Sequence, residues 1–261
     1  MHLFDTHAHL DAEEFEADRF EVVARANAAG VSNIVAIGTT ADTSFRCVEL
    51  AAQYAGVFAA VGIQPNYVHE AASGDWDRIV ELAKQPGVVA LGETGLDRYW
   101  DHAPFDLQQD FFDRHLRSSQ ATRLPFVVHM RDCEADILAM LREARSRGPL
   151  RGVMHSFTGS AEMAADCLAM GLHISFAGMV TYKKSGELRA TAATIPADCI
   201  LVETDSPYLS PEPVRKIRRN EPANVIHTAR CLADARGETL EQFAAQTTRN
   251  AQRLFLSGGT P

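Results

Sequence analysis

Short apolar runs, rich in β-branched residues, alternate along the chain with stretches of helical periodicity. Eight runs are typical of strands, at residues 3–6, 34–38, 57–61, 88–91, 125–128, 152–154, 172–176 and 200–202. Helical spacing is clearest between them at residues 20–29, 47–54, 105–120, 135–145 and 161–170, and two terminal helices are predicted near residues 224–236 and 240–255. The pattern is a strand followed by a helix, repeated eight times.

This repeated unit predicts an α/β protein with a parallel sheet. A doubly wound open sheet would use the same alternation, but eight strands spaced roughly 30 residues apart favour a closed (β/α)8 TIM barrel. No Gly-x-Gly-x-x-Gly sequence follows the first strand, where a dinucleotide-binding open sheet would carry one. Because no linker, low-complexity tract or internal repeat interrupts the chain, we expect one (β/α)8-barrel domain over residues 1–261.

Composition bears on the size of the core, the cellular compartment and the state of the cysteines. Hydrophobic residues make up 46% of the chain, which is enough for one large core. The N-terminal segment lacks the basic start and apolar core of a secretory signal, and no apolar run reaches the roughly 18 residues of a membrane span, so we expect a cytoplasmic protein without a membrane partner. The five cysteines are odd in number and scattered, which indicates reduced thiols rather than a disulfide framework.

The charge balance bears on nucleic-acid binding. A net charge of −9 argues against a protein that coats duplex nucleic acid, because such binding needs many Lys and Arg contacts to phosphates. It does not exclude a nuclease with a local cationic site. The basic stretch at residues 215–219 is one local exception to the acidic balance.

His7 and His9 stand two residues apart at the end of the first predicted strand. Side chains at this spacing on an extended segment point to the same side, so both imidazoles can hold one metal ion. Ten histidines in 261 residues supply about 0.4 such pairs by chance, so the pair alone is weak evidence.

Four more ligand-type residues follow the ends of four other predicted strands, each within about three residues, and in a (β/α)8 barrel those ends meet at one rim. They are Glu93, His129, His155 and Asp205. A histidine in such a place could instead cap a helix or satisfy a buried carbonyl group. Six convergent residues of this kind nevertheless favour a metal site over six separate structural roles.

Six ligand-type residues are more than one ion needs, so the sequence predicts two divalent ions with the Glu93 carboxylate between them. The pair His7 and His9, together with Asp205, would hold one ion, and the other two histidines would hold the second. Four imidazoles suit zinc or manganese better than magnesium. The identity of the ions, Mg, Mn or Zn, stays open on these grounds.

Several longer segments carry a family resemblance. They are residues 7–9 (His-Ala-His), 92–97 (Gly-Glu-Thr-Gly-Leu-Asp), 128–131 (Val-His-Met-Arg), 155–159 (His-Ser-Phe-Thr-Gly) and 203–208 (Glu-Thr-Asp-Ser-Pro-Tyr). Together they resemble the TatD family of metal-dependent deoxyribonucleases, nearly from end to end. The resemblance implies an amidohydrolase-type barrel, phosphodiester cleavage that is typically exonucleolytic on single strands, activity with magnesium or similar ions, and the six ligand positions given above.

One segment departs from the family pattern. Residues 62–66 read Gly-Ile-Gln-Pro-Asn where the family usually has Gly-x-His-Pro-His. Gln64 can donate a hydrogen bond to a phosphate oxygen, but it cannot carry a positive charge. Arg131, two residues after His129, is placed to hold a non-bridging phosphate oxygen. We therefore expect Gln64 and Arg131 to bind the substrate, although Arg131 could instead cap a helix or join a surface ion pair.

The expected reaction is attack of a metal-bound hydroxide on phosphorus. Asp205 would position the hydroxide and accept its proton, and Glu203 would orient the water or a ligand. Asp5 shares the strand face of the first two histidines, as Glu203 shares that of Asp205, so both carboxylates are expected to bond to a ligand histidine or to the water. An interior salt bridge is the structural alternative for Glu203.

The sequence is compatible with two rival functions. Another binuclear amidohydrolase chemistry, on a lactone, ester or amide, would use the same barrel; relatives that act on amides often bridge their metals with a modified lysine, whereas this chain has Glu93. A non-enzymatic role would leave the metal to stabilise the fold and the basic stretch to bind RNA or a partner. We expect the enzyme, with single-stranded nucleic acid as its substrate and no obligate protein partner.

Overall fold

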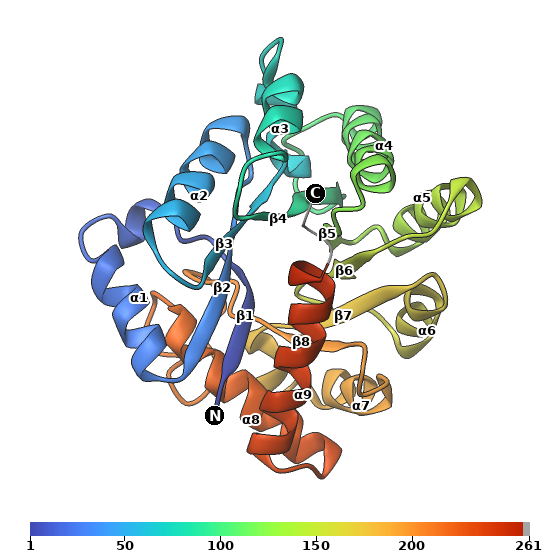
Figure 1. Ribbon diagram of the computed structural model, residues 1–261. Coiled ribbons are helices and arrows are strands. Elements are labelled where there is room, and N and C mark those ends of the chain that lie inside the picture. The colour runs from blue at the N-terminus through green and yellow to red at the C-terminus, as the bar shows by residue number, and fades with distance from the viewer. Residues whose placement is uncertain (258–261) are drawn as a thin grey trace.

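Eight parallel strands form a nearly closed barrel in the computed structural model, which describes residues 1–257 (Figure 1). Each strand pairs with the next one in the sequence. The strands are β1 Leu3–Ala8, β2 Val31–Ile37, β3 Val57–Val61, β4 Val88–Asp97, β5 Phe126–Arg131, β6 Gly152–Met154, β7 Leu172–Phe176 and β8 Ile200–Val202. The predicted (β/α)8 fold is therefore confirmed.

Helices surround the ring of strands on its outer side (Figure 1). They are α1 Arg19–Ala28, α2 Ala41–Gln53, α3 Asp75–Leu82, α4 Phe105–Thr122, α5 Glu134–Arg147, α6 Ala161–Ala169, α7 Gly186–Thr194, α8 Val225–Arg236 and α9 Leu240–Ala251. Short 3-10 helices lie at Glu13–Phe15, Pro65–Glu70, Gly178–Thr181 and Pro222–Asn224, and a π-helical segment, Gln252–Leu256, follows α9. No helix among residues 1–257 is long and apolar enough to cross a membrane.

The barrel closes between its first and last strands. The backbone N–H of Asp205 donates to the His7 carbonyl (2.9 Å), and that of His9 donates to the Ser206 carbonyl (2.8 Å). Ala8 and Ser206 form a parallel bridge at the same point. These bonds distinguish a barrel from an open sheet, and they place His7 in β1 and His9 just after it beside the segment that follows β8.

An apolar layer fills the amino end of the barrel. Phe4 packs against Phe58 and Phe255, with ring centroids 6.3 and 6.1 Å apart. Phe255 belongs to the π-helical segment, so the C-terminal part of the described chain covers this end. Because the apolar layer occupies the amino end, polar side chains inside the barrel gather at the carboxyl end, where enzymes of this fold carry their sites.

Four strands, β1, β2, β4 and β5, are longer than the hydrophobic pattern predicts. β4 extends to Asp97 and β5 to Arg131, so Glu93 and His129 lie within strands and not after them. Glycines end the apolar run of β4 without ending the strand. Gly95 has a φ of +129° and packs against β5 so closely that a Cβ atom would collide with the His129 carbonyl oxygen, which only glycine avoids.

The helices differ from the predictions mainly at their ends. α2 begins at Ala41, six residues earlier than expected, because Thr40 and Thr43 form a capping box. The predicted terminal helix ends at Ala251 and continues as the π-helical segment. α3 and α7 lie outside the predicted spans. The five cysteines are unpaired, as expected.

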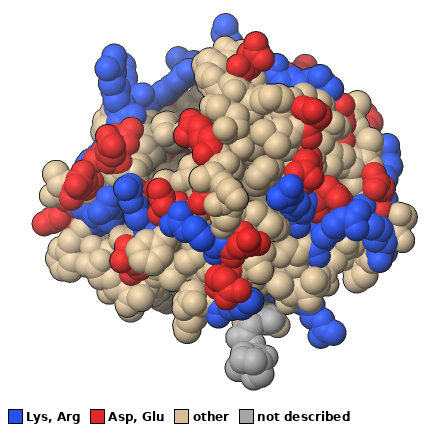
Figure 2. Space-filling model, turned by 90° about the horizontal axis from the view of Figure 1, so that it is seen from above, with Lys and Arg blue, Asp and Glu red and all other residues tan. Residues whose placement is uncertain are grey.

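Acidic and basic side chains are mixed on the surface. Figure 2 shows Lys and Arg interspersed with Asp and Glu over the face it presents. Many charged side chains of the described residues pair, for example Arg219 with Asp18 at 2.6 Å and Arg98 with Asp136 at 2.8 Å. That face therefore carries no broad basic stripe of the kind that binds duplex nucleic acid.

Candidate metal centre

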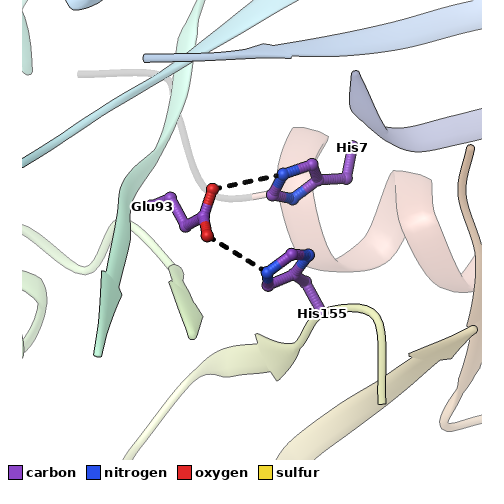
Figure 3. A group of neighbouring side chains, drawn as sticks. All are labelled: His7, Glu93 and His155. Carbon is purple, nitrogen blue, oxygen red and sulfur yellow. Dashed lines mark ion pairs between the residues drawn. The ribbon is translucent and has the colours of Figure 1, made fainter. Parts of the chain in front are cut away.

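Glu93 lies at the middle of a polar cluster at the carboxyl end of the barrel. Its side chain is almost fully buried, and its two oxygens face different histidines. Oε2 lies 3.4 Å from His7 Nε2 and 3.8 Å from His9 Nε2. Oε1 lies 2.9 Å from His129 Nδ1 and 3.2 Å from His155 Nε2. Figure 3 shows His7 and His155 at opposite oxygens of the carboxylate.

Asp205 completes the side of the cluster that contains Oε2 of Glu93. Its Oδ1 lies 3.5 Å from His9 Nε2 and 3.7 Å from His7 Nε2. The two imidazole nitrogens are themselves only 3.3 Å apart. Asp205 has a φ of 55°, a left-handed conformation that aspartate tolerates better than most residues and that turns the chain at the end of β8.

The other side of the cluster joins β5 to the residue after β6. Nε2 of His155 faces Nδ1 of His129 at 3.5 Å, so a second pair of imidazole nitrogens converges. The rings of His155 and His7 stack with their centroids 4.0 Å apart, which brings the two sides into contact. The structure thus brings together all six residues that the sequence singles out.

Asp97, at the end of β4, supports the cluster and was not among the predicted site residues. Its Oδ2 lies 2.9 Å from His129 Nε2 and accepts from Asn66 Nδ2 at 3.0 Å. A carboxylate on the far nitrogen of a ligand histidine fixes the orientation of the ring. Asp97 lies four residues after Glu93 on one strand, so period-two alternation places both on the same face and could have identified it.

Glu203 and Asp5 hold the backbone around the cluster. Oε1 of Glu203 accepts from the Ser156 N–H (2.6 Å) and lies 3.3 Å from His155 Nδ1, so its expected bond to one of the six histidines is present. Asp5 differs from the expectation. It accepts from the Thr204 N–H (2.9 Å) and hydroxyl (2.6 Å) and from the His7 backbone N–H (3.3 Å), so it joins β1 to the segment after β8 and bonds to no imidazole.

Burial and the neighbouring charges shift the pKa values of the cluster in opposite directions. Burial disfavours the charged form of Glu93, but the facing histidines outweigh it and hold the pKa of its carboxyl well below the ordinary value. Burial likewise opposes protonation of His9, yet Asp205 and Glu93 raise its pKa to about 9. The carboxylates therefore favour positive charge between them, and a metal cation in this place would compete with those protons.

The donor set fits divalent metal ions. Two groups, His7 with Glu93 and His155, and His7 with His9 and Asp205, have ligand atoms that all lie within 4.8 Å of one another. Among residues 1–257, His7 Nδ1 and Glu203 Oε2 are buried without a hydrogen-bond partner. Buried polar atoms without partners are costly, and a water molecule could pair with them. The nitrogens and oxygens that face one another, His7 Nε2 among them, are the atoms placed to hold an ion.

The cluster opens into a cleft of about 1730 Å³ at the carboxyl end of the barrel. Arg131 and Gln64 both line this cleft. Gln64 is buried and its Oε1 accepts from the Asn66 N–H at 2.8 Å, so it also caps the 3-10 helix that follows β3. The Arg131 guanidinium carbon lies 3.7 Å from the centroid of the Tyr99 ring. This contact with an aromatic ring, and not the surface ion pair considered from the sequence, holds the side chain.

These features define a class of protein, namely a (β/α)8 barrel with a cluster of histidines and carboxylates suited to divalent metals at its carboxyl end. Comparison with known proteins identifies the family within this class. The model of the TatD-related DNase family matches residues 4–256. The chain belongs to this family and is a metal-dependent hydrolase of the TatD type.

Relatives cover nearly the whole chain. "Uncharacterized metal-dependent hydrolase YabD" of Bacillus subtilis is 40% identical, over 97% of this chain and 98% of its own. "3'-5' ssDNA/RNA exonuclease TatD" of Citrobacter koseri is 38% identical, over 97% of this chain and 98% of its own. The crystal structure of YjjV, a TatD homologue from Escherichia coli K12, superposes with a TM-score of 0.90 at 28% identity, covering 97% of each chain.

Proposed function

We propose that this protein is a metal-dependent phosphodiesterase that removes nucleotides from an end of single-stranded DNA, and that it also accepts RNA. The observation that carries the proposal is the position of Glu93, whose two oxygens face two separate pairs of histidines at 2.9 to 3.8 Å. A carboxylate in this position suits the bridge between two metal ions, and paired ions are the common solution for phosphodiester hydrolysis.

The proposed ligands divide along the two oxygens of Glu93. His7, His9 and Asp205 would hold one ion on the Oε2 side, and His129 and His155 would hold the other on the Oε1 side. Imidazole and carboxylate donors together suit Zn²⁺ and Mn²⁺, and Mg²⁺ where carboxylates and water predominate. The proposed cofactor is thus a pair of divalent ions drawn from these three.

The ions would lower the pKa of a water molecule and withdraw charge from the phosphate. The chain's own groups do the rest of the chemistry. The Asp205 carboxylate holds the attacking water and accepts its proton as the new P–O bond forms and the bond to the leaving oxygen breaks. Glu203 contributes indirectly, because its bonds to His155 and to the Ser156 N–H fix the position of that imidazole. Asp205 is the catalytic residue, and Glu203 is a positioning residue.

Two further observations support a nucleic acid as the substrate. The cleft of about 1730 Å³ is larger than the roughly 300–1000 Å³ typical of sites for small molecules, so it can admit a polymer end. Arg131 lines it next to His129 and can pair with a phosphate through its planar guanidinium. Relatives 36–38% identical to this chain, including that of Citrobacter koseri, are named exonucleases of single-stranded DNA and RNA.

Digestion of end-labelled oligonucleotides tests the proposal. Single-stranded DNA, single-stranded RNA and duplex DNA would be incubated with the protein in Mg²⁺, Mn²⁺ or Zn²⁺, with and without chelator. We expect stepwise shortening of the single strands that stops when chelator is added. A matched panel of lactones, esters and amides serves as the control, and turnover of that panel without cleavage of any oligonucleotide would replace the nuclease with the rival chemistry.

A further inference from the structure

Exposed aromatic rings gather at the mouth of the cleft. Tyr67, Trp100 and Tyr208 line it, with 41%, 45% and 54% of their surface exposed, and Tyr99 beside Trp100 is 53% exposed. Most large aromatic side chains in a protein of this size are buried, as Phe4, Phe112 and others are here. Rings that stay in water beside a polar site need a reason other than the core.

The two rings after β4 are held in a defined arrangement. Tyr99 and Trp100 meet edge to face with centroids 4.8 Å apart. The Arg131 guanidinium lies 3.7 Å from the centroid of the first ring and 5.6 Å from that of the second, within the range of cation–π attraction. His102 stacks on Trp100 at 5.3 Å with an angle of 10° between the ring planes, and Trp100 still keeps almost half of its surface open.

Asp97 ties these rings to the candidate metal centre. Its Oδ1 accepts the backbone N–H groups of Tyr99 (2.9 Å) and Trp100 (3.0 Å), while its Oδ2 contacts His129 at 2.9 Å. One carboxylate therefore fixes both the turn that carries the rings and a proposed metal ligand. The distance between the rings and the reacting centre is set by a short, buried connection and not by a flexible loop.

We propose that Tyr99, Trp100 and Arg131 form a stacking platform that receives a nucleobase of the single strand next to the phosphate being cleaved. The inference rests on the proposed function and adds a base-contacting subsite to it. Every nucleobase has an aromatic face, so a platform of this kind holds the strand without reading its sequence. A structural role for the rings would be to pack the turn, but packing would bury them, and both remain about half exposed.

Removal of a base from the substrate tests the platform directly. The kcat/KM of the metal-loaded protein would be measured on a single-stranded oligonucleotide and on the same strand with abasic nucleotides at its end. Trp100→Leu should lower kcat/KM on the normal strand by about tenfold, in the range of one base–aromatic stack, and should lose little more when the base is absent. The kcat/KM of Trp100→Phe on the normal strand should lie between those of wild type and Trp100→Leu. Phe20→Leu, which alters an exposed ring on α1 outside the cleft, is the matched control and should behave as wild type.

If Trp100→Leu remains as sensitive to base removal as wild type, the platform is overturned. A second readout does not depend on cleavage. Because the chain has two tryptophans, Trp76→Phe leaves Trp100 as the sole tryptophan emitter. We expect a phosphorothioate-linked thymidine oligomer to quench its fluorescence and an abasic oligomer with the same backbone to leave it unchanged.

The two readouts separate failure of the platform from failure of the proposed function. If wild type cleaves no single strand under any divalent ion, the nuclease proposal fails, and base-dependent quenching would still support the platform. Quenching that is equal for the normal and abasic oligomers would overturn the platform even in an active nuclease.

Discussion

Replacement of Asp97 by asparagine is the perturbation for which the structure gives the most definite expectation. The aspartate accepts four hydrogen bonds: two backbone N–H groups, of Tyr99 and Trp100, bond to Oδ1, while the side chains of Asn66 and His129 bond to Oδ2. In Asp97→Asn the Oδ1 oxygen can keep both backbone bonds. Its new NH₂ group then faces two groups that also donate, so the contact with His129 is lost while the fold of the turn is kept.

The expected cost follows from the role of such carboxylates. Loss of the partner that orients a metal-ligating histidine typically weakens metal binding by about 10- to 100-fold, or about 1.4–2.8 kcal/mol. Burial raises the pKa of the Asp97 carboxyl, but the hydrogen bonds from His129 and Asn66 outweigh it and lower that pKa to about 2. The loss of metal affinity in Asp97→Asn should therefore be the same at pH values around neutrality, where Asp97 carries its charge in wild type.

Metal titration by calorimetry, together with kcat/KM on single-stranded DNA, measures the effect. We expect one of the two ions, on the side of His129, to bind 10- to 100-fold more weakly and activity to be restored in part by excess metal. Asp101→Asn is the matched control, since it makes the same chemical change on an exposed residue of the same turn. Two ions bound with wild-type affinity by Asp97→Asn would refute the reasoning.

Three other predictions concern Asp205 and Glu203 at the candidate metal centre and His115, a buried residue of α4. Asp205→Ala should abolish turnover, because the proposed proton acceptor is gone, and a variant that keeps near-wild-type rates with its metal content intact would contradict that role. Glu203→Gln should lower kcat by about 10- to 100-fold with little change in KM, because it keeps an acceptor for the Ser156 N–H but loses the charge facing His155. Burial lowers the pKa of His115 from 6.5 to about 4. Between these two pH values the imidazole is therefore protonated in the unfolded state and neutral in the folded state. The free energy of unfolding should therefore fall by about 3 kcal/mol more in wild type than in His115→Gln between those values, as measured by urea unfolding, and equal slopes would contradict it.

Most of the fold could be predicted because local patterns determine it. The eight apolar runs and their spacing predict the barrel, and the residues after each run predict which side chains meet at the rim, since parallel strands of a barrel end together. The bounds of β4 and β5 could not be read in this way. Gly92 and Gly95 interrupt the apolar run of β4, and their place in the strand depends on close contact with β5, which is distant in the sequence.

The six principal residues of the candidate site, and Glu203 beside His155, were predicted from the sequence. The supporting residues Asp97 and Asn66 were not. Asp97 on β4 contacts His129 on β5 and Asn66 in the 3-10 helix that follows β3. Alternation along β4 gives the face on which Asp97 lies, but its partners depend on the register between strands, which the pattern along one strand does not contain. Asp5 is a similar case. Alternation along β1 correctly predicts the face on which it lies, but its partner Thr204 is brought to it only by the closure of β1 on β8.

The central claim is that Glu93 lies between two divalent metal ions. Anomalous diffraction from crystals grown with manganese tests it most directly. The account predicts two peaks on either side of the carboxylate, one within bonding distance of His7, His9 and Asp205 and the other within bonding distance of His129 and His155. A single peak, or peaks that lie away from Glu93, would contradict it.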